Sequence, residues 1–364
     1  LGVAGCTALL VTGFGLRDSI GDLAQTQFDE ITKFDLYIAL DSSYEESVYY
    51  NPIVMDPILN RFLNDPKVTG YVEGFSETGY VMANGRRVET TVMVPIKSED
   101  LAKVVTLRDR RSGKGIAFSD SSVVLTEKMA ANLGLRPGDV FTLENGDGEV
   151  GEFVLSQIAE YYAGSYAYMG KNEYAQVFGE EPSCNVLMAR TSIVGSKEQD
   201  DTLTALLSSD AVLGAQFISQ IRESLDTVLN SIGLIVIVLI VSSGALAAIV
   251  LYNLININIA ERKRELATLK VLGFHGDEVA AYIFREITIL TVIGIILGFG
   301  LGLLLHGFVI RTVETPDFMF GREVSPTSMA LSGAFTLAYS FIVQLAMAPR
   351  LRNIKMAESM KVVE

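Results

Sequence analysis

Few side chains in this sequence have the types and the spacing that chemistry at a protein site requires. The stretch 145–149 (NGDGE) offers oxygen ligands of the kind that Ca²⁺ prefers, but it lacks the alternating ligands and distant glutamate of an EF-hand and is more typical of a β-turn. The sequence GKG at 113–115 lacks the glycine spacing and the following helix of a phosphate-binding loop. No serine, histidine and acid are spaced as a nucleophile with its base, so we predict no catalytic residue.

Residues that could bind a metal or take part in redox chemistry are also few. The two cysteines, Cys6 and Cys184, are far apart in the sequence, which argues against a disulfide framework. The chain has two histidines and neither a CxxC nor an HExxH motif, so we predict no zinc-type site. We expect no metal and no cofactor to be bound by this chain.

The most distinctive polar feature is the segment 261–273, which reads ERKRELATLKVLG. Its acids and bases alternate at i,i+3 spacing, which supports a helix. One interpretation is an amphipathic helix that rests on anionic lipid headgroups. The mixed charge favours a docking element for a cytosolic protein, because a lipid-binding helix would carry fewer glutamates. The residues expected at such a contact are Glu261, Arg262, Arg264, Glu265, Leu266, Leu269, Lys270 and Gly273.

Long apolar runs surround this segment. The runs 232–251, 287–305 and 328–348 carry no charge over 20, 19 and 21 residues, which is about the length that crosses a bilayer as a helix. The shorter apolar run 1–16 is interpreted as part of a transmembrane helix whose start lies before this chain. The prediction is a membrane α-helical protein with four transmembrane helices and an extracytoplasmic α+β domain between helices 1 and 2. The expected boundaries are 1–16 for the first helix, 17–226 for the α+β domain, and 227–364 for a membrane domain with helices at about 229–256, 280–306 and 327–348 and a cytoplasmic helix at 259–273.

Basic residues decide the orientation of such a protein. The loop after the second span carries five basic residues and the C-terminal tail carries four, whereas the loop 309–325 carries two basic residues against three acids. The charged segment and the tail are therefore expected in the cytosol, and residues 17–226 outside the cell membrane. Residues 17–226 contain 33 acids and 18 bases, and this net charge of −15 argues against nucleic acid as a partner.

Local patterns within residues 17–226 predict mixed strands and short helices. An amphipathic helix is expected to continue after Arg17, and residues 34–40 alternate like a strand. Asn84-Gly85 predicts a hairpin turn, and residues 126–133 a helix that ends at Gly134. Residues 219–230 are expected to return as a helix into the second span.

The composition of the apolar spans bears on whether they could form a path for ions. Ion-coupled transporters and channels usually carry ionisable groups at mid-membrane, and the middles of these spans consist mainly of Ile, Val, Leu, Gly and Ala. Gly294, Gly298 and Gly302 repeat every four residues, which predicts close packing of this helix against another.

Two parts of the sequence resemble a known family. The segment 261–274, with Glu278, Val279 and Glu286, the glycine-rich third span and the end 350–361 resemble the FtsX-like permease domain of MacB-like, type VII ABC transporters. The stretch 122–139 (SVVLTEKMAANLGLRPGD) is similar to the ectodomain of the MacB and LolC/LolE permeases.

The resemblance implies a permease of the plasma membrane that works as a dimer or pseudo-dimer with a cytosolic ABC ATPase, which would use the ATP and Mg²⁺. It implies that residues 261–272 form the coupling helix on that ATPase and that ATPase motion reaches the ectodomain without substrate crossing the helices. Substrates would be lipid-linked molecules, lipoproteins, peptides or antibiotics. A regulatory transducer for a cell-wall hydrolase or sensor kinase stays open as an alternative, and an ion-coupled transporter is disfavoured. The chain is also compatible with the second unit of a longer, duplicated permease.

Overall fold

A computed structural model describes residues 2–41, 53, 56–262, 265, 268–269, 272, 275–314, 318–321 and 324–352. The chain divides into two compact units. The helical unit comprises Leu1–Gly21, Leu229–Val313 and Gly321–Glu364, and the α/β unit comprises Asp22–Val228 and Glu314–Phe320. The short segment Glu314–Phe320 follows a helix of the first unit in sequence but belongs to the second by its contacts.

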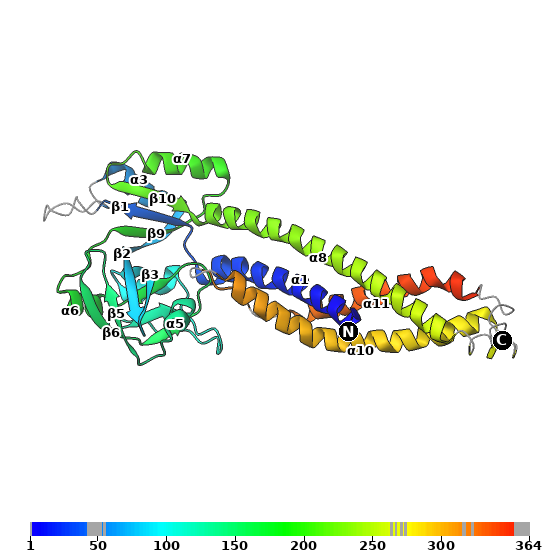
Figure 1. Ribbon diagram of the computed structural model, residues 1–364. Coiled ribbons are helices and arrows are strands. Elements are labelled where there is room, and N and C mark those ends of the chain that lie inside the picture. Colours follow the sequence, from blue (N-terminus) through cyan, green and yellow to red (C-terminus); the bar gives the residue numbers. More distant parts are fainter. Residues whose placement is uncertain are drawn as a thin grey trace. The chain divides into compact units, whose positions relative to one another are not determined.

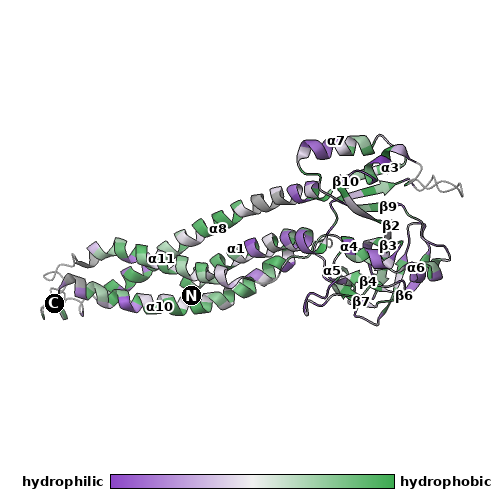
Figure 2. Ribbon diagram, turned by 180° about the vertical axis from the view of Figure 1, so that it is seen from behind, coloured by the Kyte–Doolittle hydropathy of each residue, from purple (hydrophilic) through white to green (hydrophobic). Residues whose placement is uncertain are grey.

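The long helices are α1 (Gly2–Gln25), α8 (Ile218–Glu261), α10 (Gly276–Val313) and α11 (Pro326–Arg352) (Figure 1). Among the described residues, four helical stretches are long and apolar enough to cross a membrane, namely Gly2–Ile31, Gly233–Glu261, Glu278–Val313 and Pro326–Pro349. Hydrophobic residues dominate along α8, α10 and α11 (Figure 2). The predicted architecture of four apolar helices with an α/β domain between the first and the second is confirmed.

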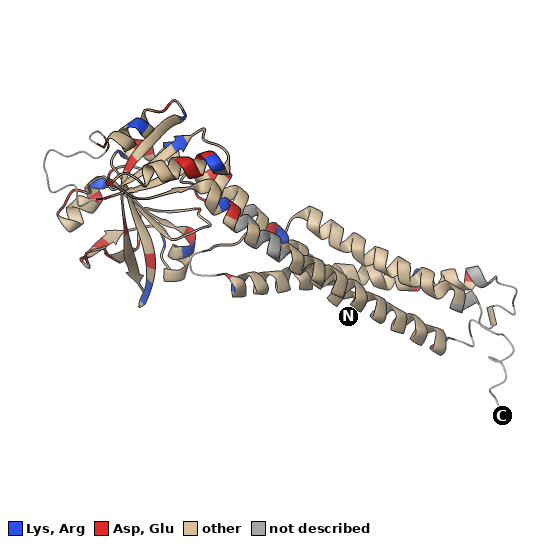
Figure 3. Cartoon of the chain, turned by 90° about the horizontal axis from the view of Figure 1, so that it is seen from above, with Lys and Arg blue, Asp and Glu red and all other residues tan. Residues whose placement is uncertain are grey.

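The outward faces of these helices carry many large apolar side chains. Leu234 of α8, Ile296 of α10 and Phe341 of α11 leave 65%, 64% and 61% of their surface exposed. In water such a surface would be costly, whereas lipid chains solvate it. Charged residues are correspondingly sparse along the long helices and frequent across the α/β unit (Figure 3).

The inward face of α11 is more polar than the sequence led us to expect. Five polar residues spaced four apart lie on one buried side of the helix: Ser328, Ser332, Thr336, Ser340 and Gln344. Cross-helix hydrogen bonds join Thr336 Oγ1 to Thr7 Oγ1 and Ser340 Oγ to Thr291 Oγ1, each at 3.1 Å. The four-residue period was the available signal, since i and i+4 share a helix face. Among the described residues of these helices, the buried polar groups are Ser, Thr, Gln and His306.

The α/β unit is built on one sheet of ten strands in the described residues, with the main order β10-β1-β9-β2-β3-β8-β4-β7 and with β5 and β6 paired beside β2. The strands are β1 (Leu36–Leu40), β2 (Val68–Ala83), β3 (Arg86–Pro95), β4 (Val123–Thr126), β5 (Val140–Glu144), β6 (Val150–Val154), β7 (Gln157–Ala159), β8 (Tyr166–Met169), β9 (Val186–Thr191) and β10 (Val212–Phe217). Most pairs are antiparallel, and β3–β8 and β4–β7 are parallel.

Local sequence explains several of these elements. Asn84 and Gly85 both have positive φ angles, 52° and 73°, as a two-residue hairpin turn between β2 and β3 requires. Helix α5 (Glu127–Leu133) ends at Gly134, whose φ of 71° is left-handed, as predicted. The helix after Arg17 is also confirmed, and it continues from α1 into a π-helical stretch, η1 (Thr26–Ile31).

Further short helices and three apolar cores complete this unit. The helices are α3 (Pro57–Leu63), η3 (Ser98–Asp100), α4 (Leu101–Val104), α6 (Lys171–Phe178) and α7 (Ser196–Leu206). One core lies under β2, β3, β5 and β6 with α5, and a second joins β1, β9 and β10 to α3 and α7. A third core combines Ile31 of η1 with residues of α4 and with the tyrosines Tyr161 and Tyr168.

Candidate functional site

The described residues of the charged segment present one outward face. Glu261, Glu265, Thr268 and Leu272 are exposed and follow each other at spacings of four, three and four residues. The Leu272 N–H donates to the Thr268 carbonyl at 3.0 Å, which is one α-helical turn. Such spacing places side chains along one face of a helix. Leu272 is 72% exposed, so it belongs to this outward face and not to the packed side of the segment.

The opposite side of the segment packs inward. Leu269 is partly buried against a core formed by α8, α10 and α11, which includes Ile255 and Ile283. The predicted contact residues Arg264, Leu266, Lys270 and Gly273 lie outside the described residues. The described part therefore combines a packed Leu269 with an exposed face that carries two carboxylates and a leucine.

Arg262 is engaged within the helical unit. Its Nη1 lies 2.7 Å from Glu286 Oε2 and its Nη2 lies 3.0 Å from Glu286 Oε1, a bidentate pair with α10. Among the described residues this is the carboxylate that Arg262 contacts, in place of the Glu265 expected from i,i+3 spacing. The pair ties the start of the charged segment to α10 as well as to α8, which precedes it.

A charge swap tests this tie. We expect Arg262→Glu to destabilise the helical unit by about 1 kcal/mol, because both side chains are about one-third exposed and solvent screens the pair. The double variant R262E/E286R restores the pair with its charges exchanged and should recover most of the loss. Thermal unfolding in detergent measures both; equal destabilisation by the single and double variants would contradict a direct pair.

Three glycines of α10, namely Gly294, Gly298 and Gly302, lie against α1. A Cβ at Gly298 would meet Thr7 Cβ at 2.5 Å and the Ala4 carbonyl oxygen at 2.9 Å, and one at Gly302 would meet Val11 Cβ at 2.6 Å. At Gly294 the nearest atom is Val3 Cγ1 at 2.9 Å, whereas Gly300 has open space around it. The spacing of four residues thus turns three glycines toward one neighbour and Gly300 away from it.

Within the α/β unit, a tyrosine-containing segment joins three parts of the chain. The Tyr162 N–H donates to Gln27 Oε1 of η1 at 2.9 Å, and the Met319 N–H donates to the Tyr162 carbonyl at 2.9 Å. Ala163 also forms a β-bridge with Phe318. Gln27 is 1% exposed and Met319 5%, so these contacts are shielded from water. One short segment therefore holds the stretch after α1 and the segment after α10.

Ion pairs surround this junction, which comprises Gln27, Tyr161–Ala163 and Phe318–Phe320. Arg108 contacts Glu30 of η1 and the buried Glu160, each at 2.6 Å. The Tyr162 hydroxyl donates to Glu160 at 2.5 Å. Burial and the neighbouring Glu160 carboxylate raise the pKa of Tyr162 well above its usual value, so the phenol stays protonated and keeps donating.

A buried ion pair fixes the segment after α10 to helix α5. Lys128 Nζ lies 2.6 Å from Glu314 Oε2, and the two side chains are 14% and 4% exposed. At this depth the two charges are screened much less than at the surface. The segment Glu314–Phe320 is thus held by an ion pair, a β-bridge and a backbone hydrogen bond.

Removing one charge of this pair should cost much more than removing both. We expect Lys128→Met to destabilise the α/β unit by about 3 kcal/mol, because the Glu314 carboxylate stays buried without the Lys128 ammonium. The double variant K128M/E314L should recover most of that stability, since apolar side chains suit the site. Chemical unfolding of the three proteins measures the effect; a loss of less than about 0.5 kcal/mol in K128M would show a solvent-screened pair instead.

Four helices that are long and apolar enough to cross a membrane, with an α/β unit inserted between the first and the second, are the organisation of a multi-pass membrane protein. Residues 231–356 match the family model of the FtsX-like permease C-terminal domain. The C-terminal third of the chain is therefore similar to an FtsX-like permease domain.

Two solved structures are similar to parts of this chain. One is the periplasmic region of MacB from Actinobacillus actinomycetemcomitans, with 11% identity, a TM-score of 0.31, and coverage of 54% of this chain and 94% of that one. The other is the extracellular domain of the noncanonic ABC-type transporter YknZ from Gram-positive bacteria, with 16% identity, a TM-score of 0.27, and coverage of 51% and 98%. No curated protein matches the chain at a significant level.

Proposed function

We propose that this permease transmits the motion of a cytosolic ABC ATPase to its α/β unit outside the membrane, where the motion acts on a substrate. The observation that carries the proposal is the combination, in one chain, of an FtsX-like permease domain with an α/β unit attached through helices that also contain the spans. ATP and Mg²⁺ would be bound by the ATPase, and this chain would be a non-enzymatic subunit that works as a dimer.

The charged segment supports the first step of this proposal, which is docking of the ATPase. Its exposed Glu261, Glu265 and Leu272 offer two charges and one apolar anchor to a partner, and Leu269 and the Arg262–Glu286 pair fix the segment to the helices. A docking surface that is fixed in this way moves the helices when the partner moves. A lipid-facing helix would gain nothing from two exposed carboxylates beside an anionic membrane.

Continuous helices support the second step, which is transmission of the motion from the charged segment to the α/β unit. Helix α8 begins directly after β10 and extends to Glu261, which is the first residue of the charged segment. Helix α1 leads into η1, which the junction residues Gln27 and Tyr162 fix to the sheet. The segment after α10 is fixed to the same α/β unit by Lys128 of α5 and by Tyr162. Three chain connections can therefore pass displacement to the α/β unit.

The proposal requires the charged segment and the α/β unit on opposite sides of the membrane. Cysteine accessibility tests this in a C6S/C184S background, with Gly276→Cys for the predicted inner side and Ser325→Cys for the outer side. An impermeant maleimide applied to intact cells should label S325C and leave G276C unlabelled until the membrane is opened. Labelling of G276C from outside would overturn the topology and the proposed coupling with it.

The substrate class decides between export and signalling. Lipid-linked molecules, lipoproteins, peptides and antibiotics fit the proposed mechanism, and so does a cell-wall hydrolase or sensor kinase driven by the moving α/β unit. Deleting the gene and comparing envelope composition with hydrolase or kinase output separates these cases. The coupling step is common to all of them.

A further inference from the structure

Strand β3 has one open edge. It pairs with β2 along its whole length, from Ala83↔Arg86 to Gly74↔Pro95, but its other edge pairs with β8 only over Thr91–Met93. Within the described part of the chain, the residues 86–90 thus have a neighbouring strand on one side only. An unpaired strand edge is a template for another extended segment.

The register shows which peptide groups face this open edge. In a hairpin with the two-residue turn Asn84-Gly85, the flanking pair Ala83↔Arg86 is hydrogen-bonded, so alternate β3 residues direct their N–H and C=O groups toward β2. Arg87 and Glu89 are the intervening residues, and their peptide groups point away from β2. Thr91 lies two residues after Glu89, so its peptide group points the same way. Its N–H donates to the Ser165 carbonyl at 2.9 Å, on the side away from β2.

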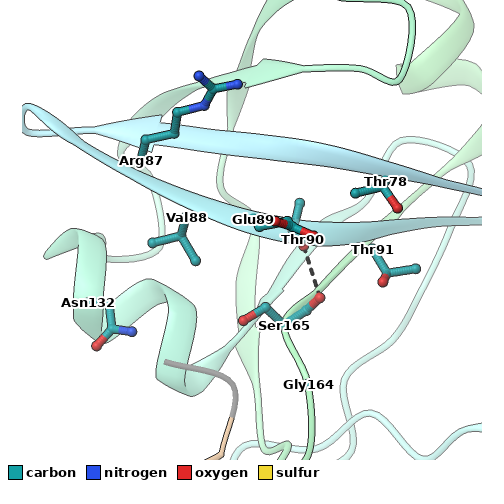
Figure 4. A pocket seen from close by; sticks show the side chains of 9 residues that line it. All are labelled: Thr78, Arg87, Val88, Glu89, Thr90, Thr91, Asn132, Gly164 and Ser165. Atoms are coloured by element: carbon teal, nitrogen blue, oxygen red, sulfur yellow. Dashed lines mark hydrogen bonds between the residues drawn. The ribbon is translucent and has the colours of Figure 1, made fainter. Parts of the chain in front are cut away.

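A pocket of about 570 Å³ lies along this edge. Its lining consists of Thr78, Arg87, Val88, Glu89, Thr90, Thr91, Asn132, Gly164 and Ser165 (Figure 4). The Thr90 hydroxyl donates to the Ser165 carbonyl at 3.1 Å, which closes one end of the pocket. The volume is within the range of ligand sites in proteins, and the lining is mostly hydroxyl, amide and charged groups.

Ser165 provides an independent sign of a missing ligand. The residue is 7% exposed, and its hydroxyl has no hydrogen-bond partner among the described residues. In Figure 4 this hydroxyl points toward the side of the pocket that carries Asn132. A buried hydroxyl without a partner is costly, and the cost is removed when a ligand supplies one.

The charges around the pocket indicate which kind of ligand it would bind. The Arg87 guanidinium is engaged, since it contacts Glu144 at 3.0 Å and stacks on the Tyr80 ring at 3.8 Å. The Glu89 side chain is exposed and, among the described residues, contacts no cation. Residues 17–226 carry a net charge of −15, which attracts cationic ligands.

We propose that this pocket binds an extended, basic peptide segment, which adds to the sheet as a strand along Arg87–Glu89. The peptide backbone would pair with the peptide groups of Arg87 and Glu89, a lysine or arginine would lie opposite Glu89, and Ser165 would bond to the peptide. This is strand addition, in which backbone bonds give affinity and side chains give selectivity. The site depends on the geometry of one strand edge and not on ATPase docking, so either proposal can fail without the other.

The test uses the full chain in nanodiscs without ATPase and a five-residue peptide of alternating threonine and lysine at about 1 mM, a concentration suited to weak binding. We expect the peptide to slow hydrogen exchange of the Arg87 and Glu89 amides by about tenfold. A peptide N-methylated at alternate residues cannot pair and should give no protection, and a threonine–glutamate peptide should bind at least about fivefold more weakly. Unchanged exchange with the lysine peptide, or equal protection by the N-methylated one, would overturn the proposal.

Variants of Glu89 distinguish the contribution of backbone pairing to peptide affinity from the contribution of charge. Glu89→Gln removes the charge and keeps the N–H, whereas Glu89→Pro removes both, and the sheet tolerates it because that N–H does not bond to β2. Affinity should fall about fivefold further in E89P than in E89Q, as for the loss of one hydrogen bond, and Ser165→Ala should weaken binding by a similar factor. Equal affinities of E89P and E89Q would show surface electrostatics instead of strand addition. If E89P does not fold, the N-methylated peptide decides.

Discussion

Replacing both Glu261 and Glu265 with lysine is expected to abolish co-purification of the partner ATPase and the stimulation of its activity. Both residues are exposed on the outward face of the charged segment, so the substitutions leave the packed Leu269 in place. Reversing two charges at a docking surface replaces attraction with repulsion, and we expect the affinity to fall by at least about 100-fold. The measurement is affinity capture of the ATPase from detergent extract, followed by ATPase activity at increasing permease concentration.

The matched control is E149K/E152K, which makes the same charge change at exposed positions of the β5–β6 hairpin in the α/β unit. This variant should bind and stimulate the ATPase as the wild type does. A second informative variant is Leu272→Ser, because this side chain is 72% exposed and we assign it as the apolar anchor of the docking surface. Normal capture and normal stimulation with E261K/E265K would remove the main support for docking at this segment.

Replacing Gly298 with leucine is expected to prevent assembly of the helical unit. Even a Cβ at this position would come within 2.5 Å of Thr7 Cβ and 2.9 Å of the Ala4 backbone, and the backbone cannot move aside without separating α1 from α10. Overpacking in a well-packed core typically costs about 1–3 kcal/mol, and four added heavy atoms against backbone place G298L at or above the upper end. The measurement is folded yield and thermal stability in detergent.

Gly300→Leu is the internal control, because no atom lies within 4 Å of a Cβ there. It adds the same side chain to the same helix and should leave stability unchanged within about 0.5 kcal/mol. Gly302→Leu should behave like G298L, since a Cβ at position 302 would lie 2.6 Å from Val11 Cβ. Equal stability of G298L and G300L would show that α1 and α10 do not pack through this face.

Features set by neighbouring residues were predictable from the sequence. The apolar runs predicted the membrane helices, Asn84-Gly85 predicted the β2–β3 turn, and Gly134 predicted the end of α5. Each depends on a local requirement: enough apolar length to span lipid, or a backbone angle that glycine or asparagine adopts at low cost. The glycine period of α10 likewise identified a face that approaches a neighbouring helix closely.

Features set by distant residues were not predictable in this way. The assignment of Glu314–Phe320 to the α/β unit depends on Lys128 and Tyr162, which are more than a hundred residues away. The same is true of the pairing of Arg262 with Glu286 in place of a neighbour on its own helix. Parallel pairing of β3 with β8 joins segments whose patterns carry no information about register, and the open edge beside it follows from that pairing.

The central claim is that ATPase motion reaches the α/β unit. It is tested most directly by the distance between spin labels at Glu152→Cys in the two copies of a permease–ATPase complex in nanodiscs, in a C6S/C184S background. We predict that trapping the ATPase with ATP and vanadate changes the distance distribution, that ADP does not, and that E261K/E265K abolishes the change. An unchanged distribution in a complex that binds and hydrolyses ATP normally would contradict the account.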